Sequence, residues 1–516
     1  MLIDKMKIAV AFISGILMGL TTAPVETWFL AWVALAPLWV LINDQKESNY
    51  SNSLLIALAW GLGYHGLALF WITGIHPMTW MGVPWLASLA IAFFCWLFIT
   101  LWGAAIVVAW AGIMRMKFIP ISASFSSSFT RVLMGVALWC CLESIWSGGP
   151  LWWGGLSYTQ SPHNLAILQW SQLSGPSTVT AAIVAVNGLI GEGFLVLAVR
   201  KLFYAIALLL LIGFHSIGLS LYNRPVETVQ ENAIQVGIIQ GNIPNEIKLY
   251  PAGFRQAIER YTTGYQTLAT SGVDVVLTPE TALPFAWQYL VDTNASFYQA
   301  ILELGVPAWL GAFGNSKGEI SPNYTNSLFT ISSTGETLSR YDKVKLVPLG
   351  EYIPFEEFFG SFIDRLSPLD AHLIKGQKEQ VLSTPFGEAI VGICYESAFA
   401  EHFRRQTAAG GEFILTAANN AHYSNTMPAQ HHAQDVMRAV ESDRWAARAT
   451  NTGYSAIINP RGKTVWISQI NKYQLHADTI YRRKSQTWYV KWGDWLTPML
   501  FFLAVTATFI NYKKRE

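Results

Sequence analysis

Eight long apolar runs constrain the fold of this chain more than any other feature. A helix needs about 20 predominantly apolar residues to cross the hydrocarbon core of a bilayer. Runs of this kind lie near residues 7–23, 27–43, 53–75, 84–112, 132–148, 172–198, 202–222 and 492–510. Charged residues make up 13% of the 516 residues, whereas soluble proteins carry roughly 25%. The sequence therefore predicts a multi-pass α-helical membrane protein.

The first run has a second interpretation. Lys5 and Lys7 precede a short apolar stretch, as in a secretory signal peptide. No convincing small-x-small cleavage site follows before the next run, so we favour a retained helix.

Before the large polar region, the basic residues lie at the N-terminus and in every second loop between the runs. Up to Tyr222 they are Lys5, Lys7, Lys46, Arg115, Lys117, Arg131, Arg200 and Lys201. The alternate loops 21–27, 76–84 and 147–164 contain none. Because cytoplasmic loops are rich in Lys and Arg, the N-terminus is predicted to be cytoplasmic.

Seven spans then place the polar region on the other side, which is the periplasm for a bacterial inner membrane. Three parts are predicted: a membrane bundle of about seven helices at 1–222, a periplasmic catalytic domain at 223–490, and a final span with a basic tail at 491–516. Lys513, Lys514 and Arg515 return to the cytoplasm. The net charge of +1 gives no reason to expect nucleic acid as a partner.

The polar region alternates between strand and helix patterns. Strands are predicted at 233–243, 273–280, 307–314, 388–397 and 411–420, with hairpins at 326–337 and 453–468. Helices are predicted at 252–270, 294–304 and 429–448. This alternation predicts a layered α/β sandwich.

Three predicted strand ends carry reactive groups, namely Glu280, Lys343 and Cys394. A thiol is mostly protonated at pH 7 and needs a base to become a nucleophile. A carboxylate can take that proton, and a lysine can stabilise the thiolate and the later oxyanion. Taken singly, Glu280 also fits an exposed turn residue. Lys343, or its neighbour Lys345, also fits a solvated strand residue.

Cys394 is the only cysteine in the polar region, since Cys95, Cys140 and Cys141 lie within predicted spans. In an oxidising compartment it has no obvious disulfide partner. It is either a buried structural thiol or a thiol kept free for chemistry.

These segments in this order resemble the nitrilase superfamily, and with eight spans they resemble the apolipoprotein N-acyltransferases of bacterial inner membranes. The matching segments are IIQGNIP (238–244), LTPETALP (277–284), YTNSLF (324–329), YDKVKLVPLGEYIPFE (341–356), GICYES (392–397) and MRAVESDRWAARATNTG (437–453). The resemblance implies an αββα sandwich attached to the membrane helices.

The resemblance also implies roles for individual residues. Glu280 would be the general base, Lys343 the stabilising lysine and Cys394 the nucleophile. Glu351 matches a glutamate that orients the lysine, and Tyr395 and Glu396 match positions next to the nucleophile. Two segments depart from the family pattern. Leu249 stands where a tryptophan is usual, and NNAHYS (419–424) differs from the usual NDAWFG.

The implied reaction moves a fatty acyl group from a phospholipid to the N-terminal amine of an S-diacylglyceryl-cysteine on an apolipoprotein, through a thioester on Cys394. Phosphatidylethanolamine is the expected donor, and no cofactor or metal is implied. A membrane-tethered amidohydrolase acting on a small amide explains the triad but not the spans. A transporter or receptor with an inactive domain is the alternative outside enzymes.

Four further features have less specific interpretations. Glu143 lies inside a predicted span, where it is either functional or structurally paired. Glu192 is predicted at the membrane interface, and the aromatic loop 148–158 reads as an interfacial belt. His431 and His432 lack metal-ligand spacing and are predicted as a surface pair on a helix.

Overall fold

The computed structural model describes residues 2–44, 49–117, 119, 124–315, 324–348, 350–352, 373–421 and 424–513. The chain divides into two compact units. The helical unit contains Met1–Thr73, Ala90–Arg224 and Trp492–Glu516. The sheet unit contains Gly74–Leu89 and Pro225–Lys491.

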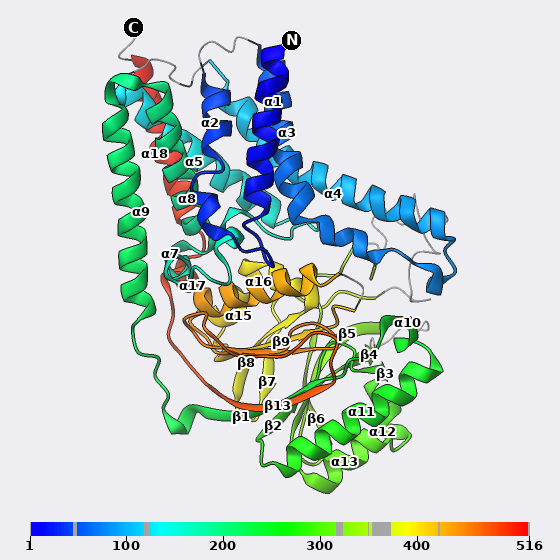
Figure 1. Ribbon diagram of the computed structural model, residues 1–516. Coiled ribbons are helices and arrows are strands. Elements are labelled where there is room, and N and C mark those ends of the chain that lie inside the picture. The colour runs from blue at the N-terminus through cyan, green and yellow to red at the C-terminus, as the bar shows by residue number, and fades with distance from the viewer. Residues whose placement is uncertain are drawn as a thin grey trace. The chain divides into compact units, whose positions relative to one another are not determined.

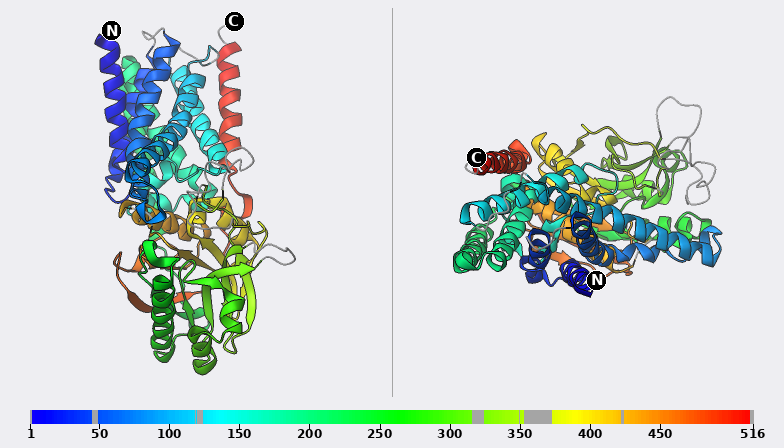
Figure 2. Two further views of the ribbon diagram at one scale, coloured as in Figure 1. Left: turned by 90° about the vertical axis from the view of Figure 1, so that its right-hand side faces the viewer. Right: turned by 90° about the horizontal axis from the view of Figure 1, so that it is seen from above.

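Long helices dominate the helical unit. They are α1 (Leu2–Gly19), α2 (Ala36–Asn43), α3 (Tyr50–Ala68), α4 (Trp85–Met114), α5 (Phe125–Ser147), α8 (Pro176–Leu195), α9 (Arg200–Tyr222) and α18 (Leu496–Lys513). Short helices connect them: η1 (Trp28–Trp32), η2 (Phe70–Ile75), η4 (Leu156–Gln160), α6 (Leu165–Leu168), α7 (Ser171–Ser174) and η5 (Leu197–Val199). The start of α1 and the end of α18 lie at the same end of this unit (Figure 1, Figure 2).

Within the described residues, five helical stretches are long and apolar enough to cross a membrane: 85–114, 125–147, 176–195, 197–222 and 496–513. Each coincides with one of the eight predicted spans. The other three predicted spans coincide with α1, with η1 and α2, and with α3. The run 27–43 is divided into two short helices, because η1 ends at Trp32 and α2 begins at Ala36.

Four buried tryptophans form the centre of the helical unit. The ring centroids of Trp110 lie 5.5 Å from those of Trp39 and of Trp139, and Trp60 lies 6.0 Å from Trp139. Each indole can keep its N–H bonded inside the bundle, as when Trp110 donates to the carbonyl of Gly135 at 2.9 Å. A Cβ on Gly15 would lie 2.1 Å from the carbonyl oxygen of Trp60. Small residues thus let α1 and α3 approach closely, as is usual between membrane helices.

Two carboxylates lie in this bundle, of which Glu192 is buried and Glu143 is partly buried. Glu192 is buried inside the bundle, and its place at the membrane interface stays a prediction. It accepts from the Nε of Arg131 at 2.9 Å and from the indole of Trp39 at 3.1 Å. Glu143 accepts from Trp139 at 3.0 Å, Thr180 at 2.8 Å and the backbone of Leu156 at 2.8 Å. Both carboxylates are therefore hydrogen-bonded to neighbouring parts of the bundle, since an unpaired charge inside it would be costly.

Two sheets form the sheet unit. Over the described residues, the first has the order β13-β1-β2-β4-β5-β6, with β3 paired to β4. Its strands are β1 (Ala233–Gln240), β2 (Val275–Leu277), β3 (Leu283–Ala286), β4 (Ala308–Asn315), β5 (Tyr324–Ile331), β6 (Thr337–Asp342) and β13 (Gln474–Tyr481). The second has the order β12-β11-β10-β9-β8-β7. Its strands are β7 (Leu382–Thr384), β8 (Gly387–Ile393), β9 (Phe413–Ala418), β10 (Ala446–Thr450), β11 (Ala456–Ile458) and β12 (Thr464–Ile467).

Each sheet has a parallel centre and antiparallel edges. The pairs β1–β2, β2–β4, β8–β9 and β9–β10 are parallel, while β13–β1 and β10–β11 are antiparallel. Parallel strands in neighbouring positions send their carboxyl ends to the same edge, which is where loops that carry function gather.

Helices cover the outer face of each sheet, so the unit is an αββα sandwich (Figure 1). The helices are α10 (Asn245–Lys248), α11 (Pro251–Thr270), α12 (Trp287–Asp292) and α13 (Ser296–Leu304) on one side, and α15 (Ala400–Ala408) and α16 (Thr426–Ser442) on the other. The short helices η3 (Thr79–Met81), η6 (Gln230–Asn232), η8 (Cys394–Ala398) and α17 (Trp488–Trp492) complete the described elements.

Alternation along the strands creates two cores. Ile238 of β1 packs between the sheets with Leu277, Val391 and Leu415. The next residue, Ile239, faces the helices and packs with Tyr261 of α11 and Phe297 of α13. Successive side chains of a strand point to opposite faces, so one apolar run supplies both layers. The predicted fold class is confirmed.

One predicted element is wrong in extent. The helix expected at 429–448 ends at Ser442, and residues 446–450 form strand β10. Asp443 adopts a left-handed conformation with φ of 51°, which stops the helix. The apolar residues Ala446 and Ala447 then continue as a buried strand rather than as helix.

Candidate active site

The three predicted reactive residues follow three different strands. Glu280 lies three residues beyond the end of β2, Lys343 directly follows β6, and Cys394 directly follows β8. The first two belong to one sheet and the third to the other. The site is therefore built between strand ends of both sheets.

Lys343 is 1% exposed and lies between two carboxylates. Its Nζ donates to the Oε1 atoms of Glu280 and Glu351, both at 2.8 Å. Asn326 of β5 supports the same pair, since its Nδ2 donates to Glu280 at 2.7 Å and to Glu351 at 3.1 Å. Glu351 is held in turn by the backbone N–H of Val347 at 2.8 Å.

The charges set the protonation of this cluster. Burial alone would raise the pKa of the Glu280 carboxyl, but the charge and hydrogen bond of Lys343 outweigh it and lower that pKa. Burial alone would lower the pKa of Lys343, but Glu280 and Glu351 raise it well above its usual value. At neutral pH Glu280 is therefore a carboxylate and Lys343 an ammonium.

Cys394 occupies a strained position at the start of η8. Its φ of 51° lies in the left-handed region, which non-glycine residues seldom adopt. Its side chain is partly exposed, although it packs at the edge of the core between the sheets.

The resting thiol is neutral. Burial, together with the nearby charge of Glu280, raises the pKa of Cys394 to about 12, and Lys343 opposes that rise. A nucleophilic role therefore requires that a base takes the proton during attack, because a preformed thiolate is scarce.

Glu396 binds the lysine segment to the nucleophile strand. Its buried carboxylate accepts from the backbone N–H groups of Val344 at 2.6 Å, Lys345 at 3.0 Å and Ile393 at 2.8 Å. The hydroxyl of Tyr341 donates to it at 3.0 Å. Glu396 is thus fully engaged in structure and is not a free base beside the thiol.

Two residues near the site have other neighbours. The Nζ of Lys345 lies 4.3 Å from the ring centroid of Phe399, whereas Lys343 is the lysine that contacts Glu280. The ring of Tyr395 packs edge-on against that same Phe399, with centroids 5.1 Å apart. Tyr395 therefore borders the nucleophile in sequence and packs on the same ring as Lys345.

Asn326 and Lys248 were not singled out from the sequence as site residues, and His431 was given a different place. Asn326 lies in the quoted segment YTNSLF, but its two carboxylate contacts depend on the pairing of β5 with β6. Lys248 and His431 bond to the carbonyl oxygens of Glu280 and Cys394. His431 and His432 are both buried, so the expectation of a surface pair is wrong. Because α16 is covered on nearly every side, the polar residues in its sequence do not mark an exposed face.

The two departures from the family pattern lie close to the site. Leu249 follows α10, directly after Lys248. The backbone N–H of Asn419 donates to the Oε2 of Glu280 at 3.0 Å. His422 and Tyr423, within the stretch 419–424, lie outside the described residues.

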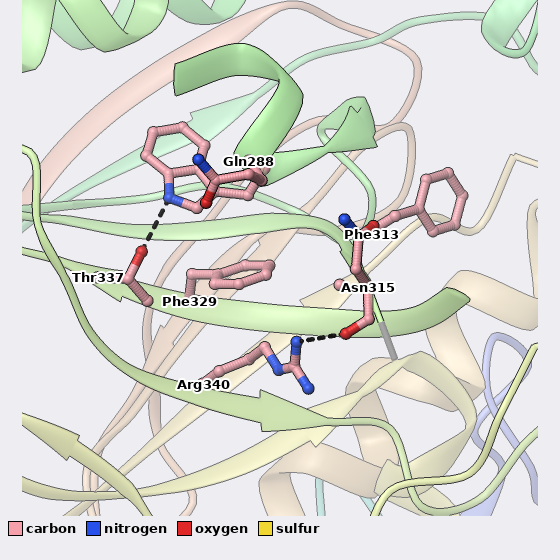
Figure 3. Close-up of a pocket in the computed structure, with 8 residues that line it drawn as sticks. Gln288, Phe313, Asn315, Phe329, Thr337 and Arg340 are labelled. Atoms are coloured by element: carbon pink, nitrogen blue, oxygen red, sulfur yellow. Dashed lines mark hydrogen bonds between the residues drawn. The ribbon is translucent and has the colours of Figure 1, made fainter. Parts of the chain in front are cut away.

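A separate cavity of about 480 Å³ lies beside β4, β5 and β6. Figure 3 shows its lining, with Arg340 donating to the carbonyl of Asn315 and Trp287 donating to Thr337. The predicted site residues do not line it. Within the described part of the chain, no group of three or more His, Cys, Asp or Glu side chains is arranged to hold a metal ion.

Two family models match the chain. The carbon-nitrogen hydrolase model matches residues 235–481. The model of the apolipoprotein N-acyltransferase N-terminal domain matches residues 14–189. The first match falls in the sheet-rich region, and the second falls in the mainly helical region that precedes it.

Relatives match over nearly the full length. An apolipoprotein N-acyltransferase from Nostoc sp. (strain PCC 7120 / SAG 25.82 / UTEX 2576) is 57% identical over 498 residues, which cover 96% of this chain and 97% of the relative. An apolipoprotein N-acyltransferase from Synechocystis sp. (strain ATCC 27184 / PCC 6803 / Kazusa) is 50% identical and covers 95% of this chain and 98% of the relative. Among solved structures, an amidase of the nitrilase superfamily from Nesterenkonia AN1 is 17% identical. That match covers 52% of this chain and 96% of the amidase, with a TM-score of 0.38, too low to carry a conclusion.

Proposed function

The chain belongs to the apolipoprotein N-acyltransferase family, and from that premise we propose that it acylates lipoproteins through a thioester on Cys394. The acyl donor is a membrane phospholipid, with phosphatidylethanolamine as the proposed headgroup. The acceptor is the N-terminal amine of S-diacylglyceryl-cysteine on an apolipoprotein. The product is a triacylated lipoprotein.

The observation that carries this proposal is the neighbourhood of the thiol. Cys394 follows β8, and its thiol is close enough to Glu280 and Lys343 for the charges of both to act on its pKa. The Oε1 of Glu280 lies 2.8 Å from the Nζ of Lys343. In the first half-reaction Glu280 takes the thiol proton as sulfur attacks the ester carbonyl carbon. Lys343 stabilises the oxyanion that forms. The carbon–oxygen ester bond then breaks, and Glu280 returns the proton to the departing lysophospholipid.

The second half-reaction transfers the acyl group to nitrogen. The neutral amine attacks the thioester carbonyl, and Glu280 accepts a proton from that nitrogen. The carbon–sulfur bond breaks, and the sulfur recovers the proton from Glu280. An amide and the free thiol result. Water competes with the amine at this stage, so the site must exclude it.

We also propose the placement of the chain in the cell. Residues 1–222 form the membrane bundle, 223–490 the periplasmic catalytic domain, and 491–516 the last span with a cytoplasmic tail of a bacterial inner-membrane protein. The segregation of Lys and Arg before residue 222 supports this orientation. Both substrates are lipid-anchored, which gives an enzyme of this kind a reason to be membrane-bound.

Acyl transfer from labelled phospholipid to a diacylglyceryl-cysteine peptide tests the proposal. The full-length protein, reconstituted in vesicles of defined phosphatidylethanolamine, phosphatidylglycerol or phosphatidylcholine, should form labelled amide fastest with the first. Equal rates with all three headgroups would remove the donor preference but keep the reaction. Release of free fatty acid without amide would show phospholipid hydrolysis instead of transfer, and hydrolysis of small amides alone would support the amidohydrolase alternative.

A further inference from the structure

Both proposed reacting side chains lie at left-handed turns. Cys394 itself has φ of 51°, and Thr281, the residue after Glu280, has φ of 46°. Non-glycine residues in this region persist only where surrounding contacts fix them. Contacts to the peptide carbonyl groups of Glu280 and Cys394 can therefore fix these two turns.

Lys248 holds the first carbonyl. It lies at the end of α10, is 4% exposed, and its Nζ donates to the carbonyl oxygen of Glu280 at 3.1 Å. A buried ammonium is costly unless it is compensated. Lys248 is bonded to the main chain of the general base and shielded from solvent, which supports a contribution to the site.

His431 holds the second carbonyl. It is fully buried in α16, and its Nε2 lies 2.8 Å from the carbonyl oxygen of Cys394. A carbonyl oxygen can only accept, so Nε2 carries the proton. Nδ1 then accepts from the Nδ2 of Asn420 at 3.0 Å.

The tautomer of His431 is fixed by hydrogen bonds that run through Asn420 to Arg448. The Oδ1 of Asn420 accepts from Arg448 at 3.1 Å, which orients its amide so that Nδ2 faces the imidazole. Arg448 is itself paired with Asp435. Burial, reinforced by the charge of Arg448, holds the pKa of His431 well below its usual value, so the ring stays neutral.

We propose that Lys248 and His431 are positioning residues that fix the peptide groups of Glu280 and Cys394, so that base and thiol address the same acyl carbon. This inference rests on the proposed function, because it takes those two side chains as the reacting pair. Lys248 acts through Glu280, and His431 acts through Cys394.

The two positioning residues differ in charge, and this separates their effects. Lys248 faces Glu280, Lys343 and Cys394, and burial lowers its pKa to about 8, so it is mainly cationic at neutral pH. Its charge helps to lower the pKa of Glu280. His431 faces Arg448, Lys343 and His432 and carries no charge of its own. Loss of Lys248 should therefore move the titration of Glu280, whereas loss of His431 should not.

Four variants of the full-length protein test the inference, with site-resolved mass spectrometry of acyl-Cys394 formation as the readout. Lys248→Met should slow acylation on the order of 10- to 100-fold and shift the acid limb of the pH profile to higher pH. His431→Leu should slow it to a similar extent with the acid limb in place. Lys248→Arg and His431→Gln keep a donor and should recover most of the rate. KM for phospholipid should change little, because neither residue is placed against the lipid.

Arg260→Met is the matched control for Lys248→Met. Arg260 donates to the carbonyl oxygen of Asn242 at 2.7 Å, and Asn242 is also left-handed, with φ of 50°. It makes the same kind of bond at a residue that carries no reacting group. His432→Leu is the control for His431→Leu, since His432 bonds to Thr464. Both controls should lower the thermal midpoint while keeping the wild-type acylation rate and pH profile.

Wild-type acylation rates in Lys248→Met and His431→Leu would overturn the inference, and so would an unmoved acid limb in Lys248→Met. So would an equal loss in the two controls, or no recovery in Lys248→Arg and His431→Gln when these are folded. If the wild type itself forms no acyl-Cys394, the proposed function fails, but the positioning roles are still tested. Alkylation of Cys394 by iodoacetamide should then slow in both variants and not in their controls.

Discussion

The backbone N–H of Val344 lies 2.6 Å from the Oε1 of Glu396. The other carboxylate oxygen accepts from the backbone of Ile393 at 2.8 Å. One buried side chain therefore joins the residue after Lys343 to the residue before Cys394. These two segments belong to different sheets, so Glu396 sets the spacing between the lysine and the thiol across the sandwich.

Glu396→Gln should damage activity and stability together. An amide has one acceptor oxygen and two donors, so at least one of the buried backbone N–H groups loses its partner. We expect a loss of about 1–3 kcal/mol in the free energy of unfolding and a fall in transfer rate on the order of 10²-fold from misplacement. The same substitution at Glu388 is the control, because that residue bonds Ser383 at the exposed end of β8. Near-wild-type transfer by Glu396→Gln would remove its positioning role.

Lys343→Ala and Lys345→Ala should differ sharply. Removing the Lys343 side chain leaves the buried Glu280 and the partly buried Glu351 without their shared cation. We expect acyl transfer to fall on the order of 10²- to 10⁴-fold, since the stabilising charge is lost. Lys345 is only half-buried and packs on Phe399, so its loss should cost less than about 10-fold. Rates measured with labelled phospholipid decide this, and the reverse order would move the lysine role two residues along.

Glu280→Gln should abolish thiol activation while keeping the fold. The volume is nearly unchanged, and the expected rate loss is on the order of 10²- to 10⁴-fold. A residual rate near the wild-type value would mean that another group takes the thiol proton. Circular dichroism and thermal unfolding of the purified variant provide the control for structure.

The pH dependence follows from the same carboxylate. Because Lys343 lowers the pKa of Glu280, the base stays deprotonated down to below about 4.3, the ordinary value for glutamate. Acylation should therefore hold constant as pH falls from 7 to 5 and decline only at lower pH. The ion pair likewise stabilises the fold above the unfolded-state pKa, and that stability is lost as pH falls through the folded-state pKa. Rapid-quench acylation rates across pH 4 to 8 measure it, and a decline centred near pH 6 would contradict it.

The sequence predicted the positions of reactive groups better than the contacts between them. Glu280, Lys343 and Cys394 each follow a strand that alternation or apolar composition identifies, so their strand-end positions were readable. The choice between Lys343 and Lys345 came from the resemblance alone. Their different contacts depend on the path of the chain after β6, where Glu396 accepts from two successive N–H groups.

Buried polar residues were the main failure. His431 was expected on the surface of a helix and is buried, and the partners of the buried Glu192 were not predicted. Local sequence shows polarity but not the partner that satisfies it. Arg131 lies 61 residues from Glu192, and Asn420, which follows β9, lies 11 residues from His431 in α16. Such pairings are properties of the tertiary fold.

The membrane topology predicts opposite accessibility at three positions. Ser271 should be periplasmic, and Lys201 and Lys513 cytoplasmic, because basic residues gather on the cytoplasmic side. Single cysteines at these positions, in a background with all four native cysteines replaced by alanine, are treated with a membrane-impermeant maleimide on intact spheroplasts. Only the cysteine at 271 should react, and all three should react after detergent lysis. Reaction at 513 but not at 271 in intact cells would reverse the orientation.

The covalent intermediate provides the most direct test of the chemistry. Mixing the enzyme with phospholipid and no lipoprotein should leave one fatty acyl group on Cys394, because the thioester then has no amine acceptor and excluded water hydrolyses it slowly. Neutral hydroxylamine should release the group, since it cleaves thioesters far faster than oxygen esters.

Cys394→Ala should carry no label. A triple alanine variant of Cys95, Cys140 and Cys141 should acylate normally, because those thiols lie in the helical unit and not beside Glu280. Adding a diacylglyceryl-cysteine peptide should discharge the label into an amide at a rate that matches overall turnover. Label that resists hydroxylamine or maps to a serine would exclude the thioester route, since an oxygen ester on the enzyme requires a different nucleophile from the one that Glu280 and Lys343 flank.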